Sequence, residues 1–104
     1  MASLMLEIRG RTMPGKREDL LRLFEEHLAP RAEQNQAQKL VVWAADDTDD
    51  DAFVLFEIYS DKTAADANAK AEWFAEYIAA SGPLLAGPPT MTLGTPRWTK
   101  GVGR

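Results

Sequence analysis

An amide, an indole and a phenol lie close together in one apolar helical segment, at Asn68, Trp73 and Tyr77. Side chains of these three types can donate hydrogen bonds from the wall of an apolar pocket. On an uninterrupted helix Asn68 and Trp73 would lie about 140° apart, because each of the five steps turns the helix by about 100°. A break near Lys70 or Ala71 is therefore needed to aim both at one cavity. The alternative interpretation makes Trp73 and Tyr77 ordinary core residues.

Two further titratable residues occupy apolar surroundings. His27 lies on the apolar side of the first predicted helix, where it can serve as a base or substrate contact near neutrality, or as a hydrogen-bonded packing residue. Glu57 interrupts a strongly apolar strand, and an isolated buried carboxylate is energetically expensive. We therefore expect Glu57 to form a structural salt bridge with an arginine of another strand. The candidate partners are Arg9, Arg11 and Arg97.

Two motifs resemble ligand sites without completing them. Segment 10–17 (GRTMPGKR) approaches the phosphate-binding pattern G-x-x-x-x-G-K-[ST]. However, Arg17 replaces the hydroxyl residue that ligates magnesium, and Pro14 removes a backbone donor. The acidic segment 46–51 (DDTDDD) can attract a divalent cation, but its spacing does not follow the EF-hand pattern. We expect a Pro-Gly turn in the first segment and a solvated hairpin tip in the second.

The composition indicates one globular domain over residues 1–104, with 45% hydrophobic and 27% charged residues. The net charge of −4 argues against binding to nucleic acid or to anionic lipid. No apolar run reaches the roughly 18 residues needed to span a membrane. Cysteine is absent and there is a single histidine, which argues against thiolate or multi-histidine metal sites and fits a reducing cytoplasm. We therefore expect a cytoplasmic protein with no metal.

Hydrophobic periodicity predicts an α+β domain with four strands and two helical regions. Glu18 and Asp19 suit the first turn of the first helix, Pro30 ends or kinks it, and segment 31–38 forms a short turn or loop. The order β-α-β-β-α-β is that of a ferredoxin-like fold with a four-stranded antiparallel sheet. The predicted strands are 4–12, 39–45, 52–59 and 90–98; the second helical region runs from a cap at 60 or 61 through 70 and on through 71–80; the ordered core is about 4–98 and the C-terminal tail is 99–104.

The third predicted strand is apolar on both sides. Phe53 and Leu55 point one way, whereas Val54, Phe56 and Ile58 point the other. Two helices can cover only one face of a four-stranded antiparallel sheet, and a solvated second face normally carries polar residues. An uncovered face of this kind would exceed the apolar patches that monomers usually expose. We therefore expect a two-fold homodimer in which the sheets of two copies pack face to face.

The order of these elements resembles a known family. A strand precedes Pro14-Gly15-Lys16 and an amphipathic helix; the second strand of the hairpin reads FVLFEIY (53–59), and a helix led by Asp61 ends in Trp73-Phe74. This pattern resembles the antibiotic-biosynthesis monooxygenase (ABM) domain over about residues 4–98. The resemblance implies a dimeric α+β barrel.

The resemblance also implies an activity. Such monooxygenases use neither metal nor flavin, because an electron-rich quinol, phenol or anthrone is deprotonated and itself reduces O₂. Many relatives carry histidines where this chain has Asn68 and Trp73, whereas members that act on polyketide anthrones use asparagine and tryptophan. Haem-degrading relatives need a histidine where Tyr77 or Ile78 stands here, so haem is not expected.

The resemblance assigns roles to particular side chains. It implies that Asn68 donates to a developing oxyanion, that Trp73 donates or stacks, and that Tyr77 relays a proton. The alternative is a non-catalytic dimer of the same fold that binds a hydrophobic small molecule or serves a stress response. The expected substrate contacts are His27, Phe24, Phe74 and Arg97.

Overall fold

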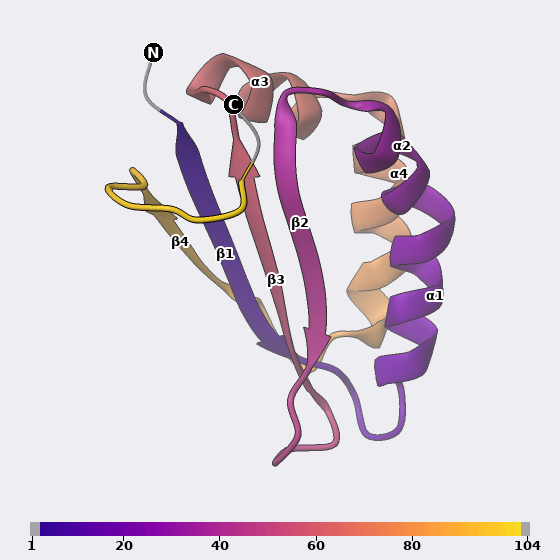
Figure 1. Cartoon of the computed structure of the whole chain (residues 1–104). Helices are drawn as coiled ribbons and strands as arrows, with labels where there is room; N and C mark the ends of the chain where they lie inside the picture. Colours follow the sequence, from indigo (N-terminus) through magenta and orange to yellow (C-terminus); the bar gives the residue numbers. More distant parts are fainter. Residues whose placement is uncertain (1–2, 103–104) are drawn as a thin grey trace.

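The chain forms a four-stranded antiparallel sheet whose helices pack against one of its faces (Figure 1). The computed structural model describes residues 3–102. The strand order β2-β3-β1-β4 confirms the predicted ferredoxin-like arrangement. The elements are β1 (Leu4–Arg11), α1 (Arg17–His27), α2 (Ala29–Gln34), β2 (Gln38–Ala45), β3 (Ala52–Tyr59), α3 (Lys62–Ala69), α4 (Glu72–Ser81), a 3-10 turn (Gly82–Leu84) and β4 (Thr90–Gly94).

The strand register separates a helix-covered face from an open face. In β3 the odd-numbered residues from 53 to 59 are all buried and lie on the side of the helices. Glu57 stands opposite Leu6 of β1 and Val41 of β2, so both its strand neighbours are apolar. The even-numbered residues of β3 lie on the open face, where Phe56 stands opposite Val42 of β2. The predicted two-sided apolar character of this strand is therefore confirmed.

The core lies between the sheet and the helix pair α1 and α4. Phe24 of α1 and Leu28, which directly follows this helix, meet Tyr77 from α4 and Leu55 from β3. Burying a large apolar side chain contributes roughly 1.5–3 kcal/mol, so this cluster holds both helices on the sheet. The cluster thereby fixes where α4 presents its other side chains.

Two boundaries differ from the sequence-based expectation. The chain after His27 continues as α2, a six-residue helix with Pro30 in its first turn, where a missing N–H costs nothing. The last strand ends at Gly94 rather than near Trp98, because Pro96 cannot donate to a sheet ladder. Trp98 is 81% exposed as a result. The last two residues of the predicted tail lie outside the described residues.

The acidic hairpin loop is tied to the start of α1. The Arg17 guanidinium donates hydrogen bonds to the backbone carbonyls of Asp46, Asp49 and Ala52, at 2.7–3.1 Å. Arg11 forms a two-pronged ion pair with Asp49, which lowers the pKa of that carboxyl to about 2. Within residues 3–102, no group of three or more His, Asp or Glu side chains is placed to hold a metal ion.

The open face combines an apolar patch with one ion pair. Val42 is 44% exposed, whereas Phe56 beside it is half-buried. On β1 the same face carries Glu7 and Arg9, which bind each other at 2.8 Å. Across the described part of the chain, no helix has the length and apolar character that a membrane crossing requires.

Candidate functional site

A cavity of about 340 Å³ lies between the sheet and the helices. A volume of this size is within the usual range for small-molecule sites. Most of its wall is aliphatic or aromatic, from β1, β3, β4, α1 and α4, and its polar groups come mainly from β2, β3 and α3. The side chains with hydrogen-bonding groups that line it include Gln38, Glu57, Tyr59, Asn68, Trp73 and Tyr77.

The helix break that Asn68 and Trp73 would need in order to share one cavity is present. The first helix of the region, α3, ends at Ala69, and Ala71 takes an extended conformation (φ −72°, ψ 145°) before α4 begins at Glu72. Asn68 and Trp73 consequently line the same cavity. Asp61 fixes the start of α3, since its carboxylate accepts a hydrogen bond from the Ala64 N–H at 2.9 Å.

A hydrogen-bonded polar cluster forms one end of the cavity. The Tyr59 hydroxyl donates to Glu57 Oε1 at 2.5 Å, and Gln38 Nε2 donates to the same oxygen at 2.8 Å. Asn68 Nδ2 donates to the Tyr59 hydroxyl oxygen at 3.1 Å and to Gln38 Oε1 at 3.3 Å. Asn35 Nδ2 in turn donates to Asn68 Oδ1 at 3.4 Å. Both amide hydrogens of Asn68 therefore have protein acceptors, and this residue holds the cluster together.

The expected salt bridge of Glu57 is wrong. Arg9 and Arg11 bind other carboxylates, Glu7 and Asp49, because β1 directs its arginines away from the helix-covered face. Glu57 lies instead among apolar neighbours, with an amide and a phenol as its partners. Burial raises its pKa above the ordinary value, although the two hydrogen bonds partly oppose this shift.

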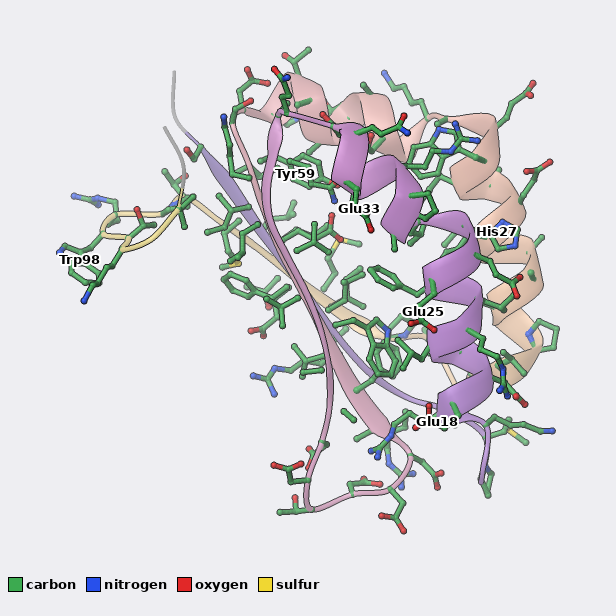
Figure 2. The ribbon with its side chains drawn as sticks, turned by 45° about the vertical axis from the view of Figure 1, so that its right-hand side comes forward. Glu18, Glu25, His27, Glu33, Tyr59 and Trp98 are labelled. Atoms are coloured by element: carbon green, nitrogen blue, oxygen red, sulfur yellow. The ribbon has the colours of Figure 1, made fainter. Side chains whose placement is uncertain are left out.

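Two tyrosines of the cavity stay protonated over the physiological range. Burial raises the pKa of Tyr77 to about 12, and the nearby Glu57 charge adds to this effect. Burial and the hydrogen bond to Glu57 also raise the pKa of Tyr59 well above its ordinary value. Figure 2 shows Tyr59 between the sheet and the helices. Among residues 3–102 the Tyr77 hydroxyl has no hydrogen-bond partner, so it remains available to a ligand.

Aromatic side chains at the start of α4 form the wall near the helix break. Trp73 packs edge-on against Phe74, with ring centroids 6.2 Å apart. The guanidinium of Arg31 in α2 lies 5.4 Å from the centre of the Trp73 ring, which is cation–π distance. The Trp73 indole N–H makes no hydrogen bond with any described residue. Trp73 and Tyr77 thus both line the cavity, and each carries a donor that no described residue engages.

The other expected substrate contacts divide into two groups. Phe24 and Phe74 line the cavity, as expected. His27 does not: its ring lies beside Tyr77 at 6.5 Å, between α1 and α4 and outside the cavity wall (Figure 2). Arg97 follows the end of β4 and is exposed, so the structure does not bring it to the cavity either.

Sequence reasoning missed Gln38 and Tyr59. Both stand at strand ends, and the register pairs them directly, with an irregularity between Gln38 and Leu40. The alternation of β3 puts Glu57 and Tyr59 on one face, and this signal was readable from the sequence. The position of Gln38 depends on the bulge, which no local sequence pattern predicts.

Several solved structures share this architecture. A candidate antibiotic biosynthesis monooxygenase from Chloroflexus aurantiacus is 22% identical over 98% of this chain and 100% of its own, with a TM-score of 0.84. Another from Nitrosomonas europaea is 13% identical over 96% and 95% of the two chains, with a TM-score of 0.86. Rv0793 from Mycobacterium tuberculosis is 21% identical over 94% and 98%, with a TM-score of 0.83.

The fold is that of the antibiotic-biosynthesis monooxygenases. At these identities the likeness concerns the fold, and one protein with a similar structure, also from Nitrosomonas europaea, is described as having unknown function. No protein-family model and no curated protein matches the chain. The ABM fold therefore supplies the framework, whereas any activity depends on the side chains that line the cavity.

Proposed function

We propose that this chain is a cofactor-independent monooxygenase that oxidises a quinol, phenol or anthrone-like aromatic with O₂. The observation that carries the proposal is the cavity of about 340 Å³, because an apolar, aromatic wall that includes two side chains with uncommitted donors closes on a polar end. Such a site accepts a flat hydroxyaromatic and surrounds it with low-polarity groups. The shared ABM fold supports the same conclusion.

The reaction draws its electrons from the substrate. Loss of the hydroxyl proton places negative charge on the ring, and a ring carbon that carries hydrogen then transfers electrons to O₂ and forms a C–O bond. The resulting hydroperoxide breaks its O–O bond and loses water, which leaves a ketone at that carbon. Substrate and O₂ are thereby converted into a quinone-type product and H₂O.

The protein has to favour the anionic form of the substrate and keep water away. The indole N–H of Trp73 and the hydroxyl of Tyr77 can donate to the developing oxyanion, which is the kind of interaction that stabilises a transition state most. Asn68 holds the polar end in place through its two hydrogen bonds. Phe24 and Phe74 contribute apolar contacts to the ring.

Oxygen uptake tests the proposal. Purified protein is mixed with a panel of quinols and anthrones in the presence of a metal chelator and without flavin. We expect O₂ consumption above the uncatalysed rate, with formation of the quinone in equal amount. The Asn68→Ala variant should consume O₂ more slowly, since the polar end of the cavity loses the hydrogen bonds that Asn68 makes.

The alternative of non-catalytic binding gives a different result. Quenching of tryptophan fluorescence by the same aromatics would then show saturable binding, while O₂ uptake stays at the uncatalysed rate with every compound. That combination would overturn the monooxygenase proposal and favour a ligand-binding role.

A further inference from the structure

Glu57 is the one buried charged side chain among the described residues, with 7% exposure. Its strand neighbours are Leu6 and Val41, and no cation lies within ion-pair distance of it in residues 3–102. A carboxylate in apolar surroundings is costly unless it is fully satisfied.

The hydrogen bonds of Glu57 are distributed unevenly. Both the Tyr59 hydroxyl and Gln38 Nε2 donate to Oε1, whereas Oε2 accepts no hydrogen bond from the described residues. Trp43 Nε1 is the one fully buried side-chain polar atom without a partner in the same part of the chain. It follows that Oε2 is not sealed in the core and reaches the cavity that Glu57 lines.

The neighbouring groups fix the direction of the Tyr59 proton. The hydroxyl oxygen of Tyr59 accepts hydrogen bonds from Asn68 at 3.1 Å and from Gln38 at 3.3 Å. Its own hydrogen therefore points to Glu57 Oε1, which then has two donors. A ligand hydroxyl entering the cavity finds its acceptor at Oε2.

We propose that Glu57 accepts the hydroxyl proton of the substrate at Oε2, and that the site therefore selects neutral hydroxyaromatics. This inference rests on the proposed function. The carboxylate takes the proton from the ring hydroxyl, and the O–H electron pair passes to the ring, which reduces O₂. The same proton then goes to the peroxide oxygen, so that Glu57 is a carboxylate again when water is lost.

The proposal defines the substrate class more narrowly than the cavity shape does. An aromatic that carries a carboxylate brings a second negative charge toward Glu57 and should bind poorly. An O-methyl ether has no proton to give and should fit without reacting. The substrate is thus an uncharged aromatic with at least one free hydroxyl.

The decisive variant is Glu57→Gln, which keeps the shape of the side chain and removes the base. We expect kcat to fall by about 100-fold or more, the usual contribution of general acid–base catalysis. The loss should shrink as the substrate hydroxyl is made more acidic by ring substituents, because solvent can then remove the proton. The matched control is Glu26→Gln, an exposed carboxyl on α1, which should retain the parent activity. Equal losses across the whole series would overturn the role of Glu57.

The Tyr59→Phe variant tests the positioning of the carboxylate. The hydrogen bond from Tyr59 lowers the pKa of Glu57, so its removal should move the acid limb of kcat/KM to higher pH. The other titratable or charged groups that face this cavity are Tyr77 of α4 and the mutually paired Lys62 and Asp66 of α3. An unchanged acid limb in Tyr59→Phe would contradict the assignment.

A binding experiment separates this inference from the proposed function. A nitrophenol, whose ionised form absorbs visible light, is titrated into the protein at pH values on both sides of its own pKa. The parent protein should bind the ionised phenol at least about tenfold more weakly than the neutral one, since two negative charges would meet in a low-polarity site. Glu57→Gln should lose this discrimination.

The nitrophenol titration and the O₂-uptake assay have distinct outcomes. In one outcome, the parent protein prefers the neutral phenol, Glu57→Gln loses this preference, and no substrate gives O₂ uptake. This outcome would overturn the proposed function and retain Glu57 as the acceptor for a ligand hydroxyl. O₂ uptake that Glu57→Gln leaves unchanged would overturn the inference and retain the function.

Discussion

Trp73 and Tyr77 donate no hydrogen bond to the described protein groups, although both line the cavity. This separates them from Asn68, whose amide hydrogens both have protein acceptors. A donor that the protein itself does not use can be removed without loss of a native hydrogen bond. Its removal therefore reports on the ligand and the reaction rather than on folding.

We expect Trp73→Phe and Tyr77→Phe each to lower kcat by about 100-fold, as the removal of one oxyanion donor commonly does. The unfolding midpoint of Tyr77→Phe should stay close to that of the parent, because the phenol ring remains in the core and no protein hydrogen bond is lost. Steady-state O₂ uptake and thermal unfolding measure the two effects. A large drop in unfolding temperature for Tyr77→Phe would show that its hydroxyl has a structural partner.

Glu57 also makes stability depend on pH. Burial raises the pKa of Glu57 in the folded protein above the ordinary value of 4.5, so the folded state binds this proton more tightly than the unfolded state does. Its stabilising contribution is complete below the unfolded pKa and is lost as the pH rises through the folded pKa. As the pH rises from the unfolded pKa of Glu57 to its folded pKa, we expect the free energy of unfolding of Glu57→Gln to increase relative to that of the parent.

Urea unfolding of both proteins over a pH series measures this difference. Asp49, whose pKa is lowered to about 2, acts in the opposite direction but is present in both proteins and cancels. The exposed variant Glu26→Gln gives the baseline for removing one carboxyl group. A constant difference between Glu57→Gln and the parent across the series would exclude a desolvated Glu57.

At the level of elements, the break between α3 and α4 decides which side chains share the cavity. The helix α3 is only eight residues long and alanine-rich, with no buried residue of its own. Helices this short are marginal without capping or packing. Its cap at Asp61 therefore bears directly on the position of Asn68 at its other end.

We expect Asp61→Ala to reduce the free energy of unfolding by about 1 kcal/mol, the usual cost of losing an N-cap. It should also lower turnover, because Asn68 is then held less firmly. Asp61→Asn keeps the acceptor for the Ala64 N–H and should stay close to the parent in both respects. Urea unfolding and O₂ uptake test this; equal stability of the alanine and asparagine variants would show that the cap contributes little.

The elements themselves were predictable from periodicity. The alternation in β3 and the two-sided apolar pattern indicated a sheet with an open face. The spacing of Asn68 and Trp73 showed only that a shared cavity needs a helix break, and this break is present. These features are local or depend on a fixed repeat. The prediction for the end of β4 failed because Pro96 and its neighbours leave the sheet earlier than their composition indicates.

The polar end of the cavity was not predictable in the same way. The partners of Glu57 come from β2 and β3, and their meeting depends on cross-strand register and on a bulge near Gln38. Charge complementarity favoured an arginine, but β1 turns its arginines to the other face. For the same reason nothing in the sequence placed His27 outside the cavity: an apolar stripe on a helix does not say which neighbour each residue meets.

At the scale of the whole molecule, the open face of the sheet is only partly covered by the chain itself. Val42 of the edge strand β2 remains 44% exposed on this face, beside Phe56 of β3. Apolar groups in such a position favour a partner surface of the same kind, and a two-fold dimer brings this face against its own copy. Because the cavity lies on the other side of the sheet, such a dimer leaves it accessible.

We expect the protein to be a dimer at micromolar concentration and Val42→Asp to be a monomer, since the variant places a charge among the apolar side chains of the packed faces. Met13→Asp is the matched control: Met13 is 46% exposed but lies in the loop before α1, away from the sheet. It should remain a dimer. Sedimentation velocity distinguishes the species, and a stable monomer of the parent protein at this concentration would show that the open face is solvated and that the cavity belongs to a single chain acting alone.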